Sequence, residues 1–168
     1  MSKFQRIEYW QNRYQEQKTD KENNKPVDPI TGLTAIDLAY LAGLIDGEGC
    51  LGIGKSVRGI HIPTIQIIMC DKEIIEWLCN VFGTALKTRI EKPPHRAQYH
   101  WRIQGHRAVN LACLLLPFLR VKAKQAEVFV SFGKTYSDDG WEKVLSEDIK
   151  LKRDSMCDEI RILNKRGC

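Results

Sequence analysis

The spacing of apolar residues along the chain predicts alternating helices and strands. Thr34, followed three residues later by Asp37, has the spacing of a capping box and predicts the start of a helix that ends at a run of glycines. Two isoleucine-rich segments, 50–57 and 59–70, predict strands joined by a short turn at a glycine. Residues 71–82 then place apolar side chains three or four positions apart, which predicts a second helix.

The second half of the chain continues this alternation. Segments 84–91 and 97–104 predict two more strands, and segments 106–118 and 121–134 predict two more helices. The charged but periodic stretch 140–163 predicts a helix that packs on the outside. The order α-β-β-α-β-β-α predicts an α+β fold, in which helices back an antiparallel sheet.

This core accounts for only part of the chain. Residues 1–33 are polar, contain two prolines and predict an N-terminal extension and linker with a short helical segment. Residues 34–134 contain the α-β-β-α-β-β-α core. Residues 135–168 predict a C-terminal helical segment packed on that core.

Alternation within the predicted strands separates a polar face from an apolar face. In segment 97–104 the polar side chains alternate with Tyr99, Trp101 and Ile103. A merely solvated sheet face usually mixes Thr, Ser, Lys and Glu, whereas Arg, Lys, Gln and His are suited to bonding base edges and phosphates. We therefore predict that this face binds DNA or RNA. The side chains expected on it are Thr64, Gln66, Lys87, Arg89, Gln98, His100, Arg102 and Gln104.

The distribution of charge supports a polyanionic partner. The net charge is +5, and residues 50–107 carry nine basic and four acidic side chains together with all four histidines. Such a basic block favours nucleic acid as the partner, although basic surfaces are also common in proteins of other kinds.

Cysteine usage and hydropathy exclude several other classes of protein. The six cysteines include no Cys-x-x-Cys pair, which argues against a zinc cluster or a disulfide framework and favours reduced thiols inside a cell. No apolar run approaches the roughly 18 residues of a membrane span, and the N-terminus is too polar for a signal peptide.

The segment LAGLIDGEG, residues 41–49, places Asp46 and Glu48 at the end of a predicted helix. Negative charge is unfavourable there because the helix dipole is itself negative at its C-terminus. A divalent cation would offset this charge, since carboxylate oxygens are its preferred ligands. Gly43 and Gly47 are four residues apart and form a flat strip that allows a second helix to approach closely. If that helix belongs to a second copy of the chain, the two acidic ends meet.

The same segment resembles the signature of the LAGLIDADG homing endonucleases, from which it differs only at Gly47 and Glu48. The predicted order of elements over residues 34–134 is similar to that of the family core. Because the chain contains one copy of the motif, it resembles the single-motif, homodimeric branch. The resemblance implies a saddle-shaped antiparallel sheet and sequence-specific, metal-dependent cleavage of a long pseudo-palindromic site in double-stranded DNA, as in intron homing.

The resemblance also implies roles for individual residues. Glu48 corresponds to the catalytic carboxylate that binds the metal, and the carbonyl of Gly47 would be a further ligand. Asp71 corresponds to the position that orients water around the nucleophile, and Lys122 to the lysine near the scissile phosphate. The expected metal is Mg²⁺, with Mn²⁺ or Ca²⁺ as other possible occupants. Asp46 would be structural, Lys124 would bind DNA, and the dimer interface would contain Ala39, Gly43 and Gly47.

Other interpretations stay open at this point. The chain is alternatively an RNA-binding intron maturase or a catalytically silent DNA-binding regulator. Asp71 is alternatively a simple helix N-cap, and Lys122 and Lys124 are alternatively general backbone-binding lysines. The resemblance implies an intracellular protein of a chloroplast, a mitochondrion or the bacterial cytoplasm.

Overall fold

The computed structural model describes residues 32–57, 59–90, 96–136 and 146–165. The N-terminal extension, apart from its last two residues, lies outside these ranges, and so do residues 92–95 of the segment 92–96 that the sequence predicts as a turn between two strands. Among the described helices, none combines the length and the apolar character that a membrane crossing requires.

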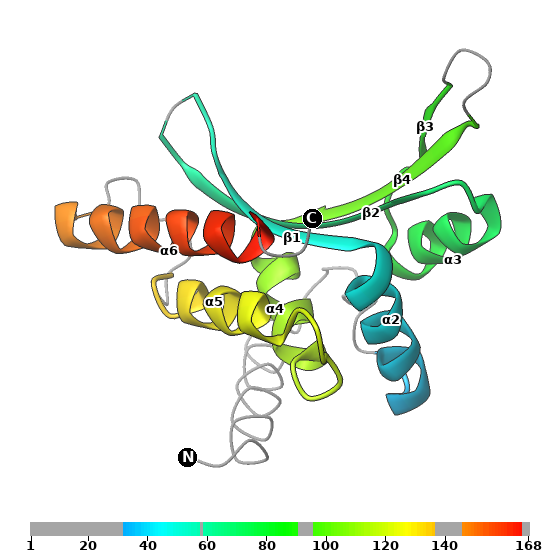
Figure 1. Ribbon diagram of the computed structural model, residues 1–168, viewed down its shortest axis with the longest axis horizontal. Coiled ribbons are helices and arrows are strands. Elements are labelled where there is room, and N and C mark those ends of the chain that lie inside the picture. The colour runs from blue at the N-terminus through cyan, green and yellow to red at the C-terminus, as the bar shows by residue number, and fades with distance from the viewer. Residues whose placement is uncertain (1–31, 58, 91–95, 137–145, 166–168) are drawn as a thin grey trace, which may run out of the picture.

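The fold is a single curved sheet with helices on one side (Figure 1). The four strands are antiparallel and lie in the order β1-β2-β4-β3. The sheet curls away from the helices, so its other face is concave and is not covered by any described element (Figure 1). The strands are β1 (Gly49–Lys55), β2 (His61–Met69), β3 (Lys87–Arg89) and β4 (Gln98–Gln104).

The helices follow the predicted order along the chain. The predicted α-β-β-α-β-β-α core, an α+β fold with a saddle-shaped sheet, is therefore confirmed. The capping box predicted at Thr34 is also present: the Asp37 carboxylate accepts from the N–H of Thr34 at 2.9 Å, and the Thr34 hydroxyl accepts from the N–H of Asp37 at 3.2 Å. The helices are α2 (Ala35–Glu48), α3 (Lys72–Phe82), α4 (His106–Leu115), α5 (Ala123–Gly133) and α6 (Glu147–Lys165).

Strand β3 and helix α4 are shorter than the sequence pattern predicts. The strand predicted over 84–91 begins only at Lys87, because Gly83 closes α3 in the left-handed conformation and the N–H of Thr84 still bonds the carbonyl of Cys79. The helix predicted over 106–118 ends at Leu115, close to Pro117, whose ring cannot continue the helical hydrogen bonds.

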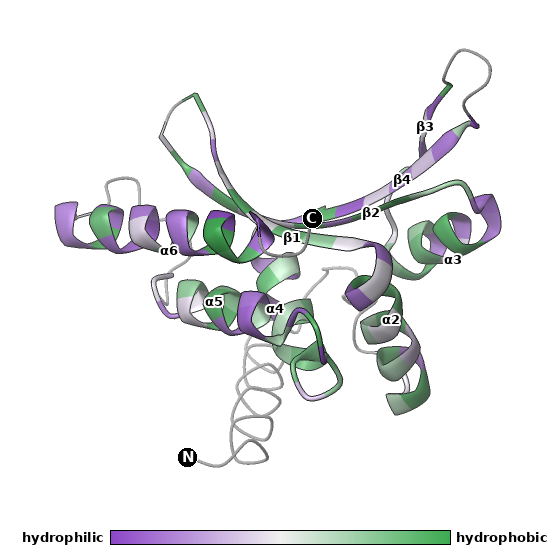
Figure 2. Ribbon diagram, viewed as in Figure 1, coloured by the Kyte–Doolittle hydropathy of each residue, from purple (hydrophilic) through white to green (hydrophobic). Residues whose placement is uncertain are grey.

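The core lies between the sheet and the helices. The inner faces of β2 and β4 supply Ile65, Ile67 and Trp101, which are all fully buried, and the ring of Trp101 lies 5.0 Å from that of Phe82 on α3. Most of helix α2 is hydrophobic (Figure 2). Not all of these residues are in the core, since Ile36 on this helix is 81% exposed.

Helix α6 lies along the helix-side face of β1. Cys157 donates to the carbonyl of Ile53 at 2.8 Å, and Asn164 donates to that of Leu51 at 2.9 Å. Asp154 bonds both Lys55 at 2.8 Å and the buried His61 at 2.7 Å, and the bond from Lys55 is the largest cause of its lowered pKa. These contacts fix α6 against the edge strand β1 and the start of β2, on the side of the sheet opposite its concave face.

Candidate nucleic-acid interface and cleavage site

The concave face of the sheet collects the polar side chains of three strands. Residues that face each other across antiparallel strands project to the same side. Gln66 faces Arg102 and Thr64 faces Gln104 across β2 and β4. Across β3 and β4 the facing pairs are Lys87 with His100 and Arg89 with Gln98. All eight sheet residues predicted from the alternation therefore share one face, and the core residues share the other.

Two hydrogen bonds organise the centre of this face. Arg102 donates from Nη2 to Oε1 of Gln66 at 3.0 Å, and Gln104 donates from Nε2 to Oγ1 of Thr64 at 3.2 Å. Arg102 and Gln104 are exposed, so each keeps hydrogen-bonding groups available to a ligand. Because their side chains are already restrained, they would lose less conformational entropy when they bind one.

Strand β1 presents almost no side chains to the concave face. Its residues on that side are Cys50, Gly52 and Gly54, which lie opposite Gln66, Thr64 and Ile62. A Cβ added at Gly52 or Gly54 would meet no atom within 4 Å. Sequence reasoning assigned no role to this strand, although the spacing of Gly52 and Gly54 is a signal that could have indicated its bare surface.

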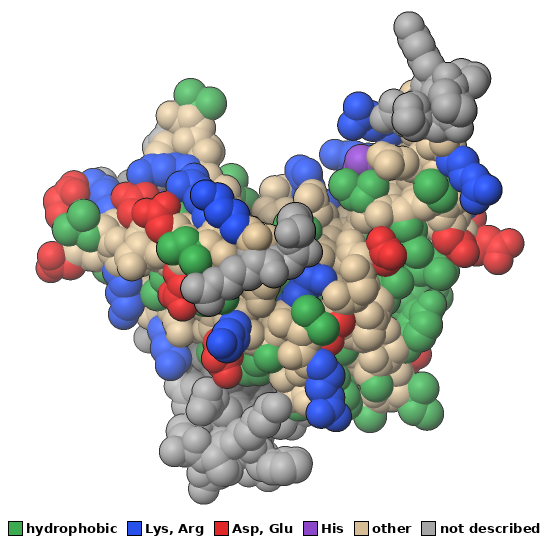
Figure 3. All heavy atoms as spheres, viewed as in Figure 1, with side chains coloured by type: hydrophobic (Ala, Val, Ile, Leu, Met, Phe, Trp, Pro, Cys, Tyr) green, Lys and Arg blue, Asp and Glu red, His purple; other side chains and the backbone are tan. Residues whose placement is uncertain are grey.

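Basic side chains gather around one end of the concave face. Lysine and arginine side chains and a histidine lie near the β3–β4 end of the sheet (Figure 3). Lys87 and Arg89 on β3 are both exposed. At the other end, Lys55 is held by Asp154 on the helix side of the sheet and so belongs to a structural ion pair.

The candidate cleavage site lies where α2 runs into β1. Glu48 is the last residue of α2 and is exposed, and within the described ranges its carboxylate has neither a hydrogen bond nor an ion pair. Gly47 beside it is also exposed. The structure thus places an unneutralised carboxylate at the negative end of a helix dipole, where a cation or a cationic partner is favoured.

Gly49 makes the sharp passage from helix to strand possible. Its N–H bonds the carbonyl of Ile45, and its backbone is extended, with φ −80° and ψ 155°. A Cβ at this position would lie 2.7 Å from both the Cα and the carbonyl oxygen of Ile45. Glycine is therefore required here by close packing against the backbone of α2.

We predict that Gly49→Ala lowers the free energy of unfolding by about 1–3 kcal/mol, because the backbone of α2 must shift to admit the methyl group. Gly52→Ala on the same strand is the matched control, since its methyl group would enter open space. Chemical denaturation of the two variants measures the difference. Equal stability of Gly49→Ala and Gly52→Ala would contradict the close approach at Gly49.

Asp46 joins the motif helix to the loop between α4 and α5. Its Oδ2 accepts from the backbone N–H groups of Arg120 at 2.7 Å and Val121 at 3.2 Å, and its Oδ1 accepts from that of Lys122 at 2.9 Å. The Nζ of Lys122 in turn donates to the carbonyl of Asp46 at 2.6 Å. Lys122 therefore lies beside the end of α2. The residue that it contacts there, Asp46, is two positions before Glu48 in the sequence.

The bonds to Asp46 also explain why α5 starts later than the sequence predicts. The pattern predicts a helix from residue 121, whereas α5 begins at Ala123. The backbone N–H groups of 120–122 turn toward Asp46, and the residues that carry them do not adopt the helix.

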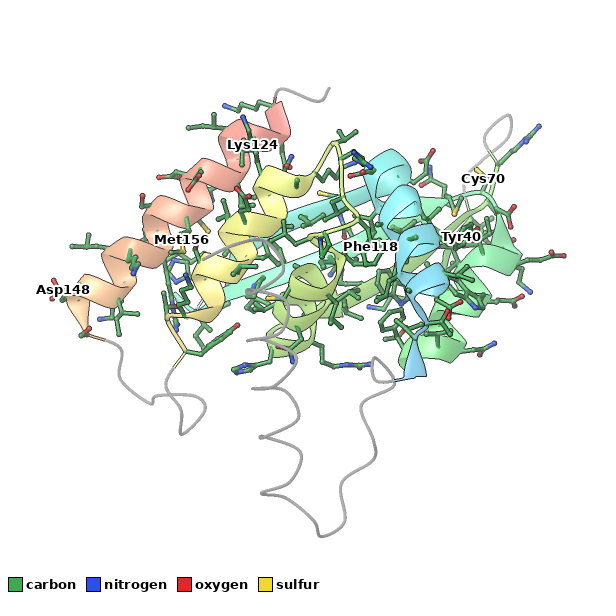
Figure 4. All side chains as sticks on the ribbon, turned by 90° about the horizontal axis from the view of Figure 1, so that it is seen from below. Tyr40, Cys70, Phe118, Lys124, Asp148 and Met156 are labelled. Atoms are coloured by element: carbon green, nitrogen blue, oxygen red, sulfur yellow. The ribbon has the colours of Figure 1, made fainter. Side chains whose placement is uncertain are left out.

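Lys124 is exposed on the first turn of α5. Viewed from below, the loop that leads to Lys124 passes α2, with Phe118 on the side of that helix facing α4 (Figure 4).

Asp71 serves as the N-cap of α3, the alternative that the sequence left open. Its side chain accepts from the N–H of Ile74 at 3.3 Å. It follows β2 directly, at the end of the β1–β2 pair where α2 meets β1. Within the described ranges no hydrogen bond links Asp71 to Glu48 or Lys122, and its predicted part in orienting water stays a prediction.

One copy of the chain offers an incomplete set of metal ligands. No group of three or more His, Cys, Asp or Glu side chains occurs among the described residues. The Glu48 carboxylate and the neighbouring Gly47 carbonyl are hard oxygen donors, which suit Mg²⁺, Mn²⁺ or Ca²⁺. They fit such a cation only if further oxygen ligands come from a second copy or from the phosphates of a substrate.

Comparison with known proteins identifies the fold. No protein-family model matches the sequence, and no curated protein does. Solved structures do match. I-CvuI, solved in complex with the I-CreI target in the presence of Mg, has 15% identity and a TM-score of 0.59 over 76% of this chain and 82% of its own.

Two further structures share the fold at similar distance. The LAGLIDADG meganuclease I-AabMI, bound to uncleaved DNA, has 21% identity and a TM-score of 0.52 over 71% of this chain and 43% of its own. The LAGLIDADG homing endonuclease I-GzeII, in complex with its DNA target, has 17% identity and a TM-score of 0.51 over 74% of this chain and 43% of its own. The chain thus spans less than half the length of these two proteins.

Proposed function

We infer that this chain, whose fold is that of the LAGLIDADG homing endonucleases, is a DNA endonuclease that cleaves a long, specific site. The observation that carries the proposal is the end of α2, where the free carboxylate of Glu48 lies next to the loop of Lys122. Both residues lie near the junction of α2 with β1, the edge strand of a sheet whose concave face bears arginine, lysine and glutamine. One region thus offers a hard-metal ligand, a cation for phosphate and groups that read bases.

We assign metal binding to Glu48 and Gly47. A divalent cation held there would supply charge neutralisation at the phosphate and activation of water for hydrolysis. The choice of a divalent cation rests on the oxygen donors of these residues and on the absence of any other partner for Glu48 among the described residues. Lys122 would stabilise the negative charge that develops on the phosphate oxygens.

A homodimer would complete the site. Helix α2 has an exposed strip of small and apolar residues spaced by three or four positions: Ile36, Ala39, Gly43 and Gly47. A Cβ on Gly43 or Gly47 would meet no atom of the described chain within 4 Å, so a second helix can approach the backbone closely. The same helix of a second copy would bring two Glu48 carboxylates together and provide the ligands that one copy lacks.

The dimensions of the sheet set the length of the expected target. Strand β2 has nine residues and therefore spans roughly 30 Å, or about nine base pairs at 3.4 Å each. Two copies would read about 20 base pairs of a pseudo-palindrome. The half-buried Ile62 and Ile68 on the same face would contact thymine methyl groups in the major groove.

The proposal is tested by selecting a site and then cutting it. The full chain is incubated with a library of palindromic DNA sites randomised in each half, and bound sequences are enriched. We expect the enriched DNA to be cleaved on both strands with Mg²⁺ or Mn²⁺ and to stay bound but uncut in EDTA. Specific binding without cleavage in any divalent cation would instead identify a silent regulator, and binding restricted to folded intron RNA would identify a maturase.

Arg102 and Lys124 should affect recognition differently. We predict that Arg102→Ala relaxes base preference at one position of each half-site, because a bidentate arginine–guanine contact contributes about 1–3 kcal/mol of discrimination. Lys124→Ala should weaken binding to all sequences alike and reduce the slope of log K against log salt by about 1, because it removes one phosphate contact. Binding of both variants to a panel of single-base site variants measures the difference. Uniform losses of affinity for both would contradict this division.

A further inference from the structure

Both carboxylate oxygens of Asp46 accept hydrogen bonds from the backbone of another segment. It accepts three N–H groups in succession, from Arg120, Val121 and Lys122, across more than 70 positions of sequence. Hydrogen bonds to an ionised acceptor are stronger than those between neutral groups. They offset the unfavourable position of this acid at the C-terminus of α2, so Asp46 needs no metal to be stable there.

The side chain of Lys122 returns the contact. Its Nζ donates to the backbone carbonyl of Asp46 at 2.6 Å, which leaves the ammonium at the negative end of α2, one position before Gly47. Two groups of Asp46 therefore hold two groups of Lys122: the carboxylate binds the amide and the carbonyl binds the ammonium. This arrangement fixes both the backbone and the head group of the lysine relative to the motif.

Other contacts hold the rest of the loop. Leu119 is buried, and its N–H bonds the carbonyl of Leu115 at 3.0 Å. On the other side, the N–H of Ala126 bonds the carbonyl of Lys122 as α5 begins. At the start of α5 itself no side chain from the N-cap residue supplies a bond. The loop is thus anchored at both ends without Asp46, and the three bonds of Asp46 decide the conformation only between them.

We propose that Asp46 is the positioning residue for Lys122 in DNA cleavage. It acts through the lysine by fixing where the loop presents the ammonium at the end of α2, the helix that Glu48 terminates. The proposal rests on the proposed function, in which Lys122 acts on the phosphate, and it gives the first acid of the motif a part distinct from metal binding. Misplacement of a reacting group by about 1 Å can cost on the order of 100-fold in rate.

The test is a double-mutant cycle with a matched control. Asp46→Asn keeps the shape of the side chain, but its NH₂ group would face one of the N–H donors of the loop. We expect it to lower the single-turnover cleavage rate about 100-fold with little change in DNA affinity. In the Lys122→Met background the same change should have almost no further effect. Asp37→Asn, which removes a structural aspartate at the other end of α2, should act equally in both backgrounds.

A second measurement reads the position of the lysine without cleavage. Acetylation of the wild type and Asp46→Asn by an amine-reactive reagent is followed by mass spectrometry, with Lys124 as the internal reference. We expect Lys122 to react about tenfold faster in Asp46→Asn. The asparagine keeps the backbone carbonyl that accepts from Nζ, but it loses the charge-assisted bonds to the loop backbone that hold the lysine beside that carbonyl.

The outcomes separate the two proposals. Unchanged labelling of Lys122, or rate effects that multiply independently in the cycle, would overturn the positioning role of Asp46 even if the protein cuts DNA. Faster labelling in a protein that cuts no selected site would support the positioning of Lys122 and overturn the proposed nuclease function instead.

Discussion

Replacing Glu48 by glutamine is expected to abolish cleavage of the selected DNA site while leaving binding to that site nearly unchanged. The free carboxylate at the end of α2 is the only acid we assign to the metal, and a neutral amide is a poor ligand for a hard divalent cation. Loss of such charge stabilisation costs several kcal/mol, and each 1.36 kcal/mol is about tenfold in rate, so we expect a decrease of about a thousandfold or more.

The effect of Glu48→Gln on binding should have the opposite sign. The substitution removes a negative charge near the phosphates, so affinity in EDTA should be equal to or slightly above that of the wild type. Glu127→Gln makes the same chemical change on the exposed surface of α5 and serves as the control for both measurements. Cleavage by Glu48→Gln at a rate near that of the wild type would rule out Glu48 as the metal ligand.

Gly43→Leu should separate the two copies of the chain and eliminate double-strand cleavage. In the proposed interface two α2 backbones meet at Gly43, and an isobutyl group on each would push them apart and move the two Glu48 sites. Within one copy the leucine meets no described atom near its Cβ, and leucine is favoured over glycine in a helix by about 0.8 kcal/mol. The separated monomer should therefore remain folded.

Analytical ultracentrifugation of the wild type and Gly43→Leu measures this directly. Ser155→Leu places the same side chain on an exposed position of α6 and should leave both the dimer and the activity intact. If the wild type sediments as a monomer when it cuts DNA, or if Gly43→Leu remains an active dimer, α2 is not the interface between copies.

Local pattern was sufficient for the order of elements and for the polar face of the sheet. The alternation around Trp101 separates core from surface because a strand has a period of two, and the same rule placed Arg102 and Gln66 on one face. The Thr34–Asp37 capping box and the N-cap at Asp71 were also readable, because each is formed within four residues.

The features that local pattern could not predict depend on distant partners. The bonds from Asp46 to residues 120–122 join segments that only the folded chain brings together, and no periodicity in either segment reveals them. The late start of α5 follows from those bonds, and it was mispredicted for that reason. Helix α6 was predicted as a charged outer helix, but its contacts with His61 and Ile53 depend on its path across the sheet.

The bare side of β1 on the concave face bears on how the proposed recognition of DNA could be redesigned. Gly52 and Gly54 have open space where a side chain would begin, and they lie opposite Thr64 and Ile62. Glutamine or arginine introduced there would extend the reading surface without disturbing the existing pair of Arg102 and Gln66. New sequence preferences can therefore be gained by addition at vacant positions, and the residues that already contact one another can be kept as they are.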